Sequence, residues 1–386
     1  MATRSRIAFY APLKPPDDPI PSGDREIARL MVAALSAAGH DVELPSRFIS
    51  YQKRPDGAVF RERRKAGAEE AARLIHAWRE SDQRPHLWFT YHPYCKAPDW
   101  LGPAVATALS IPYVTAEACR TFQGSHTDWQ DGRAAVQRAV KMAAVNFCLK
   151  PSDEAYLRSF LPDMRSVVPL RPFIDPHGWT VERPSTGPKA VFTHAGPIII
   201  AVGMMRPGVK IASYRLLAES LFGLQDKSWN LVIVGDGPEQ DTIKGMFQFA
   251  RERVCFTGSL PHSQVLGWMQ ASDLLAWPGI GEAIGMVYLE AQALGLPIAA
   301  CDTAGVANVV MNGITGLLAP QADAPAFRET LAALLASENE RRRLSAAGPT
   351  AITSKHDSMG AAATLGRALD PLLRRGAHLA GKAVPS

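Results

Sequence analysis

The chain is predicted to be an α/β protein with two Rossmann-like domains, whose parallel sheets face a central cleft. Short β-rich runs alternate with amphipathic stretches, which is typical of parallel-sheet architecture. This alternation occurs twice along the chain, and a stretch rich in Pro and Gly separates the two series. A length of 386 residues also exceeds one ordinary hydrophobic core, so two domains are expected.

The first series is expected to form an N-terminal domain over residues 1–175. Residues 23–39 show the apolar period of an amphipathic helix. The β-rich runs of this series are residues 6–12, 86–92, 111–116 and 145–149. Residues 172–196 have little periodicity and many Pro, Gly and polar residues, so we expect the domain boundary there.

The second series is expected to form a C-terminal domain over residues 190–360. Its β-rich runs are residues 197–203, 230–237, 253–258, 273–277 and 296–301. Ligands of such folds bind at the carboxyl ends of the strands, so functional residues are sought in the segments that follow each run. A last helical region, within residues 360–386, is expected to pack back on the N-terminal domain.

Composition limits the function classes. An apolar content of 47% with 20% charged residues is that of a soluble globular protein. The sequence has no secretory signal pattern and no apolar run of membrane-spanning length, so a cytoplasmic location is expected. The five cysteines never occur in a C-x-x-C spacing, which argues against a disulfide framework or a zinc site.

The net charge of +5 is too small to indicate a nucleic-acid partner. One local cluster of basic residues stands out, and a solvated loop explains it best. Peripheral association with an anionic membrane, on its inner face, is the alternative. The cluster consists of Lys53, Arg54, Arg61, Arg63, Arg64 and Lys65.

Two acids occur in the otherwise apolar stretch 278–301. Glu282 is predicted on a loop, and Glu290 lies inside the helix that starts at Gly285. A carboxylate in such a helix needs a donor or a cation, and the helix start can hold an anion. The arrangement therefore suits the sugar, diphosphate and ribose of a nucleotide sugar. In the alternative reading Glu282 is a capping or loop acid, and Glu290 forms a buried pair with an arginine.

Other residues of the same domain favour the first reading. Arg206 and Lys210 follow a strand on a Pro-Gly loop, where two cations could grip a diphosphate. Gly235 and Gly237 follow another strand, although their spacing is not the dinucleotide fingerprint. We expect these glycines to let the turn pass tightly beside a base and its ribose.

Together these motifs resemble the C-terminal domain of GT-B-fold retaining glycosyltransferases of family four, also called glycosyl transferases group 1. The resemblance covers about residues 200–320 and is strongest in the E-x(7)-E spacing of Glu282 and Glu290 followed by "EAQALGLPI". It implies that Arg206, Lys210 and Glu282 are the catalytic residues, with both cations on the diphosphate and Glu282 at the sugar hydroxyls. The resemblance also implies which residues bind the donor. Glu290 is expected at the ribose, Gly285 and Met286 at the phosphate, Phe256 near the base, and Gly23 near the phosphate and the acceptor.

The resemblance implies transfer of a hexosyl group from a nucleoside-diphosphate sugar with retention of configuration. The expected acceptor is a glycan, a lipid-linked or a small molecule, in synthesis of cell-surface polysaccharide, lipopolysaccharide or another glycoconjugate. Family members often carry a histidine after the strand that corresponds to residues 111–116, whereas this chain has Glu117 there and His92 after an earlier strand. Both are acceptor-side candidates, and a structural role of His92 beside its tyrosine neighbours is the alternative.

No cofactor is expected, because the nucleotide sugar is a co-substrate. The chain contains no D-x-D pair to hold a divalent metal, so positive charge must come from the protein, and no metal is expected to be required. Three other functions stay open: a GT-B-fold nucleotide-sugar epimerase, an NAD-dependent oxidoreductase, and a non-catalytic sugar-nucleotide-binding protein. The absence of G-x-G-x-x-G after the first strand counts against the oxidoreductase.

Overall fold

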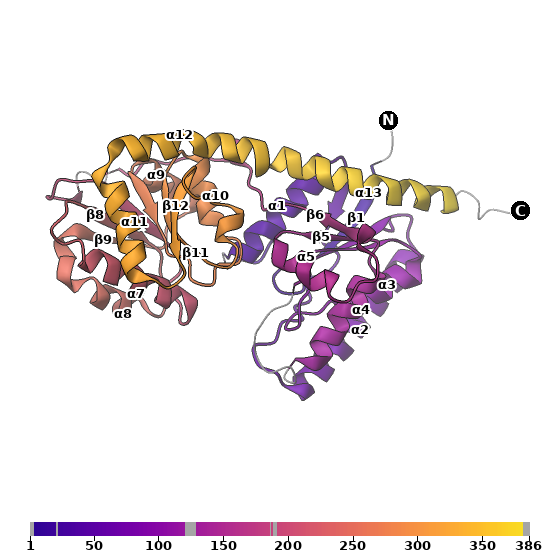
Figure 1. The fold of residues 1–386 in the computed structure, drawn as a ribbon. Helices are drawn as coiled ribbons and strands as arrows, with labels where there is room; N and C mark the ends of the chain where they lie inside the picture. The colour runs from indigo at the N-terminus through magenta and orange to yellow at the C-terminus, as the bar shows by residue number, and fades with distance from the viewer. Residues whose placement is uncertain (1–3, 21, 120–128, 186, 188–190, 381–386) are drawn as a thin grey trace, which may run out of the picture. The chain divides into compact units, whose positions relative to one another are not determined.

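The structure is a computed structural model that describes residues 4–20, 22–119, 129–185, 187 and 191–380 (Figure 1). The chain divides into two compact units: unit 1 is Met1–Pro172 with Ser358–Ser386, and unit 2 is Phe173–Asp357. Each unit contains one six-stranded parallel sheet with helices packed on it. The predicted α/β class with two Rossmann-like domains is therefore confirmed.

Unit 1 has the strand order β2-β1-β3-β4-β5-β6. All neighbouring strands are parallel. The strands are β1 (Arg6–Tyr10), β2 (Asp41–Glu43), β3 (Leu87–Tyr91), β4 (Tyr113–Ala116), β5 (Val145–Cys148) and β6 (Val167–Pro169). The helices are α1 (Gly23–Ala37), α2 (Gly57–Arg79), α3 (Gly102–Leu109), α4 (Gln130–Met142), α5 (Pro151–Arg158) and α13 (Ser358–Ala380), with a 3-10 turn η1 (Met164–Ser166).

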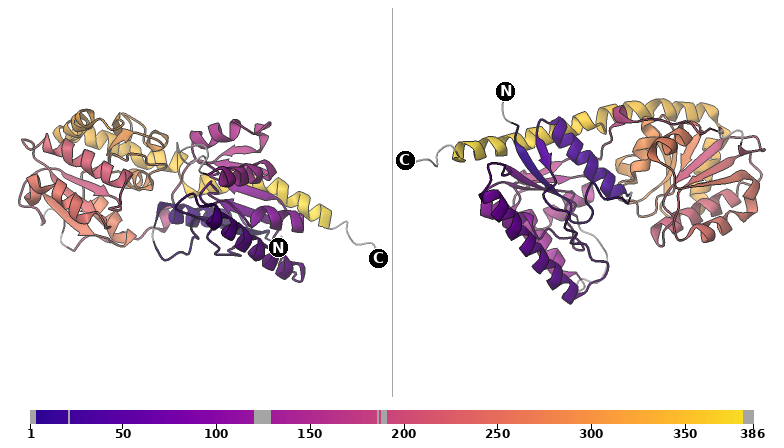
Figure 2. Two further views of the ribbon diagram at one scale, coloured as in Figure 1. Left: turned by 90° about the horizontal axis from the view of Figure 1, so that it is seen from below. Right: turned by 180° about the vertical axis from the view of Figure 1, so that it is seen from behind.

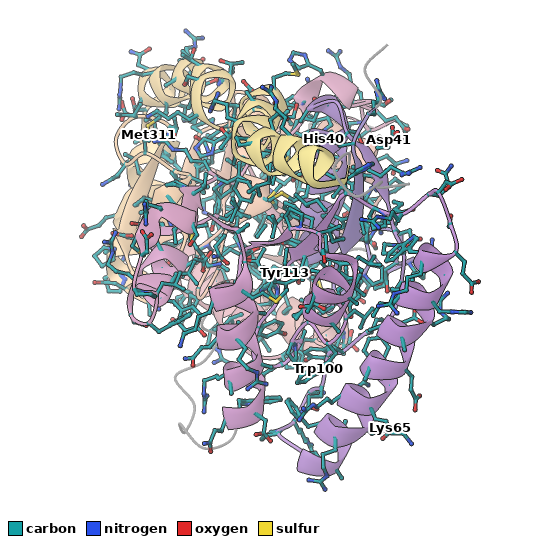
Figure 3. The ribbon with its side chains drawn as sticks, turned by 90° about the vertical axis from the view of Figure 1, so that its right-hand side faces the viewer. His40, Asp41, Lys65, Trp100, Tyr113 and Met311 are labelled. Carbon is teal, nitrogen blue, oxygen red and sulfur yellow. The ribbon has the colours of Figure 1, made fainter. Side chains whose placement is uncertain are left out.

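The last helix, α13, packs beside α1 in unit 1 (Figures 1 and 2). Leu365, Leu369 and Leu373 recur every four residues and are buried, which gives the helix one apolar face. His40, which precedes β2, is buried against the same helix (Figure 3), and its Nε2 lies 4.0 Å from Asp370 Oδ1. The end of the chain thus completes the core of the first unit.

The core of unit 1 on the α2 and α3 side is aromatic. Trp88 and Tyr10 on neighbouring strands are fully buried there, and their rings lie 5.8 Å apart. Tyr113 points into the same core (Figure 3) and its hydroxyl donates to Asp99 Oδ2 at 3.0 Å. Asp99 Oδ1 accepts from the amides of Leu101 and Gly102, and Oδ2 also accepts from the Thr90 hydroxyl, so this buried acid has partners on both oxygens.

Helix α2 carries much of the basic cluster. Its Phe60 ring contacts Trp100 edge-on, while Lys65 points away from the unit (Figure 3). Among the described residues, none of the helices combines the length and the apolar character needed to cross a bilayer.

Unit 2 has the strand order β12-β11-β10-β7-β8-β9, which is the 3-2-1-4-5-6 order of the Rossmann fold. Its strands are β7 (Ile198–Val202), β8 (Asn230–Val234), β9 (Val254–Gly258), β10 (Leu274–Ala276), β11 (Ile298–Asp302) and β12 (Gly316–Pro320). Its helices are α7 (Val209–Phe222), α8 (Gln240–Met246), α9 (His262–Gln270), α10 (Met286–Ala293), α11 (Ala324–Ala336) and α12 (Glu338–Lys355). Three 3-10 turns are η2 (Pro176–Gly178), η3 (Gln248–Arg253) and η4 (Val306–Asn308).

Candidate functional site

In unit 2 the strand order reverses between β7 and β10. The chain adds β8 and β9 beside β7, and β11 and β12 beside β10, while β7 and β10 pair directly. In open α/β sheets such a reversal leaves a ligand-binding crevice at the carboxyl ends of the two central strands. Residues 203–208 leave the end of β7 and lead into α7, and residues 277–285 leave the end of β10 and lead into α10. The three predicted catalytic residues lie on or directly after these segments.

Tight contacts fix the path of segment 277–285. Gly279 and Gly285 have φ angles of +65° and +72°, in the left-handed region that favours glycine. A Cβ on Gly279 would collide with the Tyr288 hydroxyl, and a Cβ on Gly285 would lie 2.5 Å from a Tyr288 ring carbon. The same hydroxyl donates to the Trp277 carbonyl at 2.9 Å. The loop is therefore held against the first turn of the helix that it introduces.

Glu282 and Lys210 form an ion pair at this crevice. Lys210 Nζ donates to Glu282 Oε2 at 2.5 Å, and the side chains of Lys210 and Glu282 are 23% and 22% exposed. The ammonium also lies 5.4 Å from the centre of the Trp277 ring, which is a cation–π distance. Lys210 is the second residue of α7, so its predicted place on the Pro-Gly loop is wrong. The fold brings these two candidates together from segments 72 residues apart.

Arg206 lies on the segment between β7 and α7, and its side chain is exposed. Two hydrogen bonds hold this segment: the Tyr214 hydroxyl donates to the Gly203 carbonyl at 2.6 Å, and the Met205 amide donates to the Asp236 carbonyl at 2.9 Å. Within the described part of the chain the Arg206 guanidinium has no ion-pair partner. Its charge is therefore available to an anion in solution.

Two helices begin beside this ion pair. α10 begins at Met286 with Gly285 as its N-cap, and α7 begins at Val209. Gly281 lies so close to Val209 that a Cβ on the glycine would be 3.0 Å from the valine side chain. No described side chain caps either helix. The first amides of a helix lack partners within it and carry partial positive charge, so the two starts together suit an anion.

Glu290 lies about one turn inside α10, and its side chain is 15% exposed. Its Oε1 is 3.1 Å from Nε2 of His262, the first residue of α9. The alternative reading, in which Glu290 pairs with an arginine, is wrong. Sequence reasoning missed His262, because only the tertiary meeting of α9 and α10 brings the two residues together.

The turn after β8 contains two of the predicted donor residues. A Cβ on Gly235 would collide with the Gly203 carbonyl, and one on Gly237 with the Met205 carbonyl. Packing against the neighbouring backbone therefore requires both glycines, whether or not a ligand is bound. Phe256 lies in the half-buried edge strand β9 next to this turn. Donor contacts of these residues stay a prediction.

Unit 1 has its own reversal of strand order, between β1 and β3. Gly23 is the first residue of α1, and the space at its Cβ position is open. His92 directly follows β3, and its Nδ1 lies 3.1 Å from Oδ1 of Asp24. Its Nε2 lies 3.4 Å from Cys119 Sγ. The start of α1 and the end of β3 thus meet through an imidazole that is 12% exposed.

Glu117 directly follows the adjacent strand β4 and is buried. Its carboxylate accepts hydrogen bonds from the Tyr91 hydroxyl at 3.0 Å and from Lys150 Nζ at 2.7 Å. Lys150 also contacts Asp153 at 3.1 Å. Both His92 and Glu117 have positive φ angles, +55° and +53°, which are uncommon outside glycine and cluster at functional sites.

These charges shift one another's pKa values. Burial lowers the pKa of His92, but Glu117 and the neighbouring groups raise it well above its usual value. Burial raises the pKa of Glu117, but His92 and Lys150 outweigh burial and hold it below its usual value. Burial raises the pKa of Asp153 to about 6. Near neutral pH the end of this sheet therefore carries a buried network of ionised groups.

Sequence reasoning named His92 and Glu117 without connecting them, and missed Asp24, Lys150 and Asp153. All five lie immediately after a strand or at the start of the helix that follows one. That shared position was the available signal, because the carboxyl ends of parallel strands meet at one edge of a sheet.

Residues 189–351 match the model of the family described as "Glycosyl transferases group 1". A curated glycogen synthase of Mycobacterium tuberculosis is 26% identical over 294 residues, which cover 73% of this chain and 66% of that protein. A D-inositol 3-phosphate glycosyltransferase of Nocardia farcinica is 31% identical over 157 residues, 38% of this chain and 35% of that protein. The chain thus matches two thirds or less of the length of these relatives.

Solved structures with the same fold extend over both units. A sucrose-phosphate synthase of Thermosynechococcus elongatus has a TM-score of 0.73 at 19% identity, over 96% of this chain and 100% of that chain. Anabaena HepE in complex with UDP and glucose has a TM-score of 0.67 at 14% identity, over 95% of this chain and 100% of that chain. At such identities these likenesses show the fold alone. The chain therefore has the GT-B fold, and its residues 189–351 match the glycosyl transferases group 1 family.

Proposed function

We propose that the protein is a retaining glycosyltransferase that moves a hexosyl group from a nucleoside-diphosphate sugar to a hydroxyl group of an acceptor. The observation that carries the proposal is the Glu282–Lys210 pair at the strand reversal of unit 2, beside two helix starts. This arrangement combines an acid that can accept hydrogen bonds from sugar hydroxyls with positive groups that can bind a diphosphate. The similarity to a glycogen synthase and to a D-inositol 3-phosphate glycosyltransferase supports the same reaction class.

The positive groups are proposed to bind the donor diphosphate. Lys210 has three N–H donors, so it can keep Glu282 and still bind a phosphate oxygen. Arg206 supplies a second full charge, and the amides of Gly285 and Met286 supply partial charges at the start of α10. Glu290 accepts the ribose hydroxyls, with Phe256 and the Gly235–Gly237 turn near the base.

The transfer step breaks the bond between the sugar C1 and the diphosphate oxygen and forms a bond from C1 to the acceptor oxygen on the same face. The acceptor proton passes to the departing phosphate oxygen, so the protein need not supply a nucleophile or a base. Negative charge grows on the nucleoside diphosphate as it leaves. Lys210, Arg206 and the helix start stabilise that charge, which is electrostatic catalysis without a required metal.

The acceptor is proposed to contact unit 1 near Gly23, His92 and Glu117. Asp24 lies at one nitrogen of the imidazole and Cys119 Sγ at the other, and the pKa of His92 is raised well above its usual value, so this side chain supplies positive charge rather than acting as a base. Glycan, lipid-linked and small hydroxylated acceptors all offer hydroxyl oxygens that such a charge attracts. Synthesis of cell-surface polysaccharide, lipopolysaccharide or another glycoconjugate is the proposed role.

The basic cluster is proposed to place the protein at the inner face of an anionic membrane. Arg61, Arg64 and Lys65 on α2 are exposed, as are Lys53 and Arg54 before it. Each lysine or arginine near an anionic surface contributes about 1 kcal/mol. Cosedimentation with phosphatidylglycerol vesicles, absent with phosphatidylcholine vesicles and lost in high salt, is the expected result. Equal recovery with both vesicle types would contradict the proposal.

Calorimetric titration with UDP-, GDP- and ADP-sugars tests the donor site. One donor class should bind the wild-type chain, and Lys210→Ala should weaken that binding at least tenfold, because a charged hydrogen bond contributes about 1.5 to 3 kcal/mol. Lys227→Ala, at an exposed lysine paired with Asp226 in the same unit, is the matched control and should bind normally.

The reaction itself is tested by incubating the protein with the donor that binds and with each class of acceptor, and following the donor sugar by NMR. Release of nucleoside diphosphate with a new glycosidic product in the donor's anomeric configuration is expected. Isomerised donor formed without acceptor would identify an epimerase, and unchanged donor with every acceptor class would identify a binding protein. Either outcome would overturn the proposal.

A further inference from the structure

His262 lies against the carboxylate proposed to bind the ribose. Its Nε2 is 3.1 Å from Glu290 Oε1, and it comes from a different helix, α9. Within the described residues the second oxygen, Glu290 Oε2, accepts no hydrogen bond from the protein. An ionised carboxylate only accepts, so the imidazole must donate here. One oxygen is therefore fixed and the other is free for a ligand.

A tryptophan from the segment after η2 lies against the same imidazole. The rings of Trp179 and His262 meet edge-on, with centres 5.7 Å apart and an interplanar angle of 84°. Trp179 is half-buried, and His262 is 50% exposed, so both rings keep an accessible side. The tryptophan ring and the Glu290 carboxylate thus both contact the same imidazole.

The start of α9 holds the segment that carries this tryptophan. The Glu182 amide donates to the Ser263 carbonyl at 3.0 Å, and the Ser263 hydroxyl donates to the Glu182 carboxylate at 2.9 Å. Gly267 packs directly on the Glu182 carbonyl, where a Cβ would collide. These contacts fix Trp179 relative to α9 and hence relative to Glu290.

We propose that His262 is a positioning residue that orients Glu290 for the ribose hydroxyls, and that Trp179 forms an apolar wall of the nucleoside pocket. The inference rests on the proposed function and adds the part of the site that recognises the nucleoside. A nucleoside combines a diol with a flat base. A carboxylate with one free oxygen fits the diol, and an aromatic side chain fits the base. Trp179 thereby becomes part of the donor site.

A surface ion pair is the competing explanation of the His262–Glu290 contact, and exposed pairs of this kind contribute little. The two explanations differ in what the pair does to ligands. A surface pair affects no ligand selectively, whereas a positioning residue affects only ligands that contain the ribose diol. The experiment therefore compares ligands that differ in this diol.

The test measures dissociation constants of UDP, GDP and ADP, of the 2′,3′-dideoxy form of the nucleotide that binds best, and of inorganic pyrophosphate. His262→Ala should raise the dissociation constant of the ribonucleotide about tenfold, since one hydrogen bond to a charged group has about this effect. The dissociation constants of the dideoxynucleotide and of pyrophosphate should change by less than about twofold. His262→Gln, which keeps a neutral donor, should recover most of the affinity. Trp179→Leu should weaken both nucleotides and leave pyrophosphate unchanged.

His177→Ala is the matched control, because His177 is an exposed histidine of the same unit on η2. It should bind every ligand as the wild type does. If His262→Ala lost the same affinity for the ribonucleotide, the dideoxynucleotide and pyrophosphate, or lost none, the inference would be overturned. The proposed donor binding by the wild-type chain would be unaffected by either result. A wild-type chain that binds none of the three nucleotides would instead overturn the proposed function, and the inference with it.

Discussion

Replacing Gly285 with alanine should damage unit 2 in two separable ways. Gly285 has φ +72°, and a left-handed alanine costs roughly 1 to 2 kcal/mol. Its new Cβ would also lie 2.5 Å from a ring carbon of Tyr288, so the ring must move by almost 1 Å to restore ordinary contact. Tyr288 is fully buried and holds the Trp277 carbonyl, so this overpacking adds about 1 to 3 kcal/mol. The expected total loss of unfolding free energy is about 2 to 5 kcal/mol.

Gly313 in the same unit separates the two contributions. Its φ is +73°, but nothing lies within 4 Å of its Cβ position. Gly313→Ala should therefore cost only the left-handed conformation, roughly 1 to 2 kcal/mol. Scanning calorimetry of both variants measures the difference, and titration with the nucleotide sugar follows. Gly285→Ala should also bind donor more weakly at temperatures where it is folded, since the start of α10 has shifted, and Gly313→Ala should bind normally.

Two results would refute this reasoning. Equal destabilisation by the two substitutions would mean that the loop before α10 relaxes freely around Tyr288. Unchanged donor affinity in a destabilised Gly285→Ala variant would mean that the start of α10 does not contact the diphosphate.

Four further outcomes are expected. Glu290→Gln should weaken donor binding ten- to a hundredfold with little change in kcat, whereas Glu282→Gln should lower kcat more than it raises the donor KM. Wild-type kcat and donor KM in both folded variants would mean that both acids are structural. Gly23→Ala should fold as the wild type does, since its Cβ meets nothing within 4 Å, but should lose transfer activity if a phosphate or acceptor approaches that backbone; unchanged activity would remove Gly23 from the site. Donor binding and transfer should persist in excess EDTA, and activity restored only by magnesium or manganese would show that a metal supplies the charge. The pKa of Asp153 is raised to about 6 in the folded state, so ionising this carboxyl lowers stability by an amount that grows as pH rises from about 4 to about 6. Asp153→Asn should therefore increase the free energy of unfolding at pH 8 by up to about 3 kcal/mol and raise the melting temperature there, with no such gain at pH 4. A lower melting temperature of the variant at pH 8 would contradict this reasoning.

The sequence predicted nine of the strands correctly because their apolar runs are long and bounded by turn residues. It missed β2, β6 and β12, each for a local reason. Residues 41–43 and 167–169 are three-residue edge strands that are largely half-exposed, and 316–320 follows a loop without a clear alternation. Such strands are defined by pairing with a neighbour rather than by their own composition.

The site was predictable where residues follow adjacent strands. Glu282 and Lys210 follow β10 and β7, so their approach could be expected from the carboxyl-edge rule. The partner of Glu290 was not predictable, because His262 starts a helix after a third strand and nothing in its sequence neighbourhood specifies the contact. The network around His92 could have been expected from the carboxyl-edge rule, because its members follow strands of one sheet or lie at the starts of the helices that come next.

A crystal structure of the chain with the nucleotide sugar that calorimetry selects tests the central claim most directly. The proposal predicts a diphosphate within hydrogen-bond distance of the Met286 amide and Lys210, sugar hydroxyls on Glu282, and the ribose diol on Glu290. A donor bound elsewhere on unit 2, with the Glu282–Lys210 pair untouched and the start of α10 open to solvent, would contradict it.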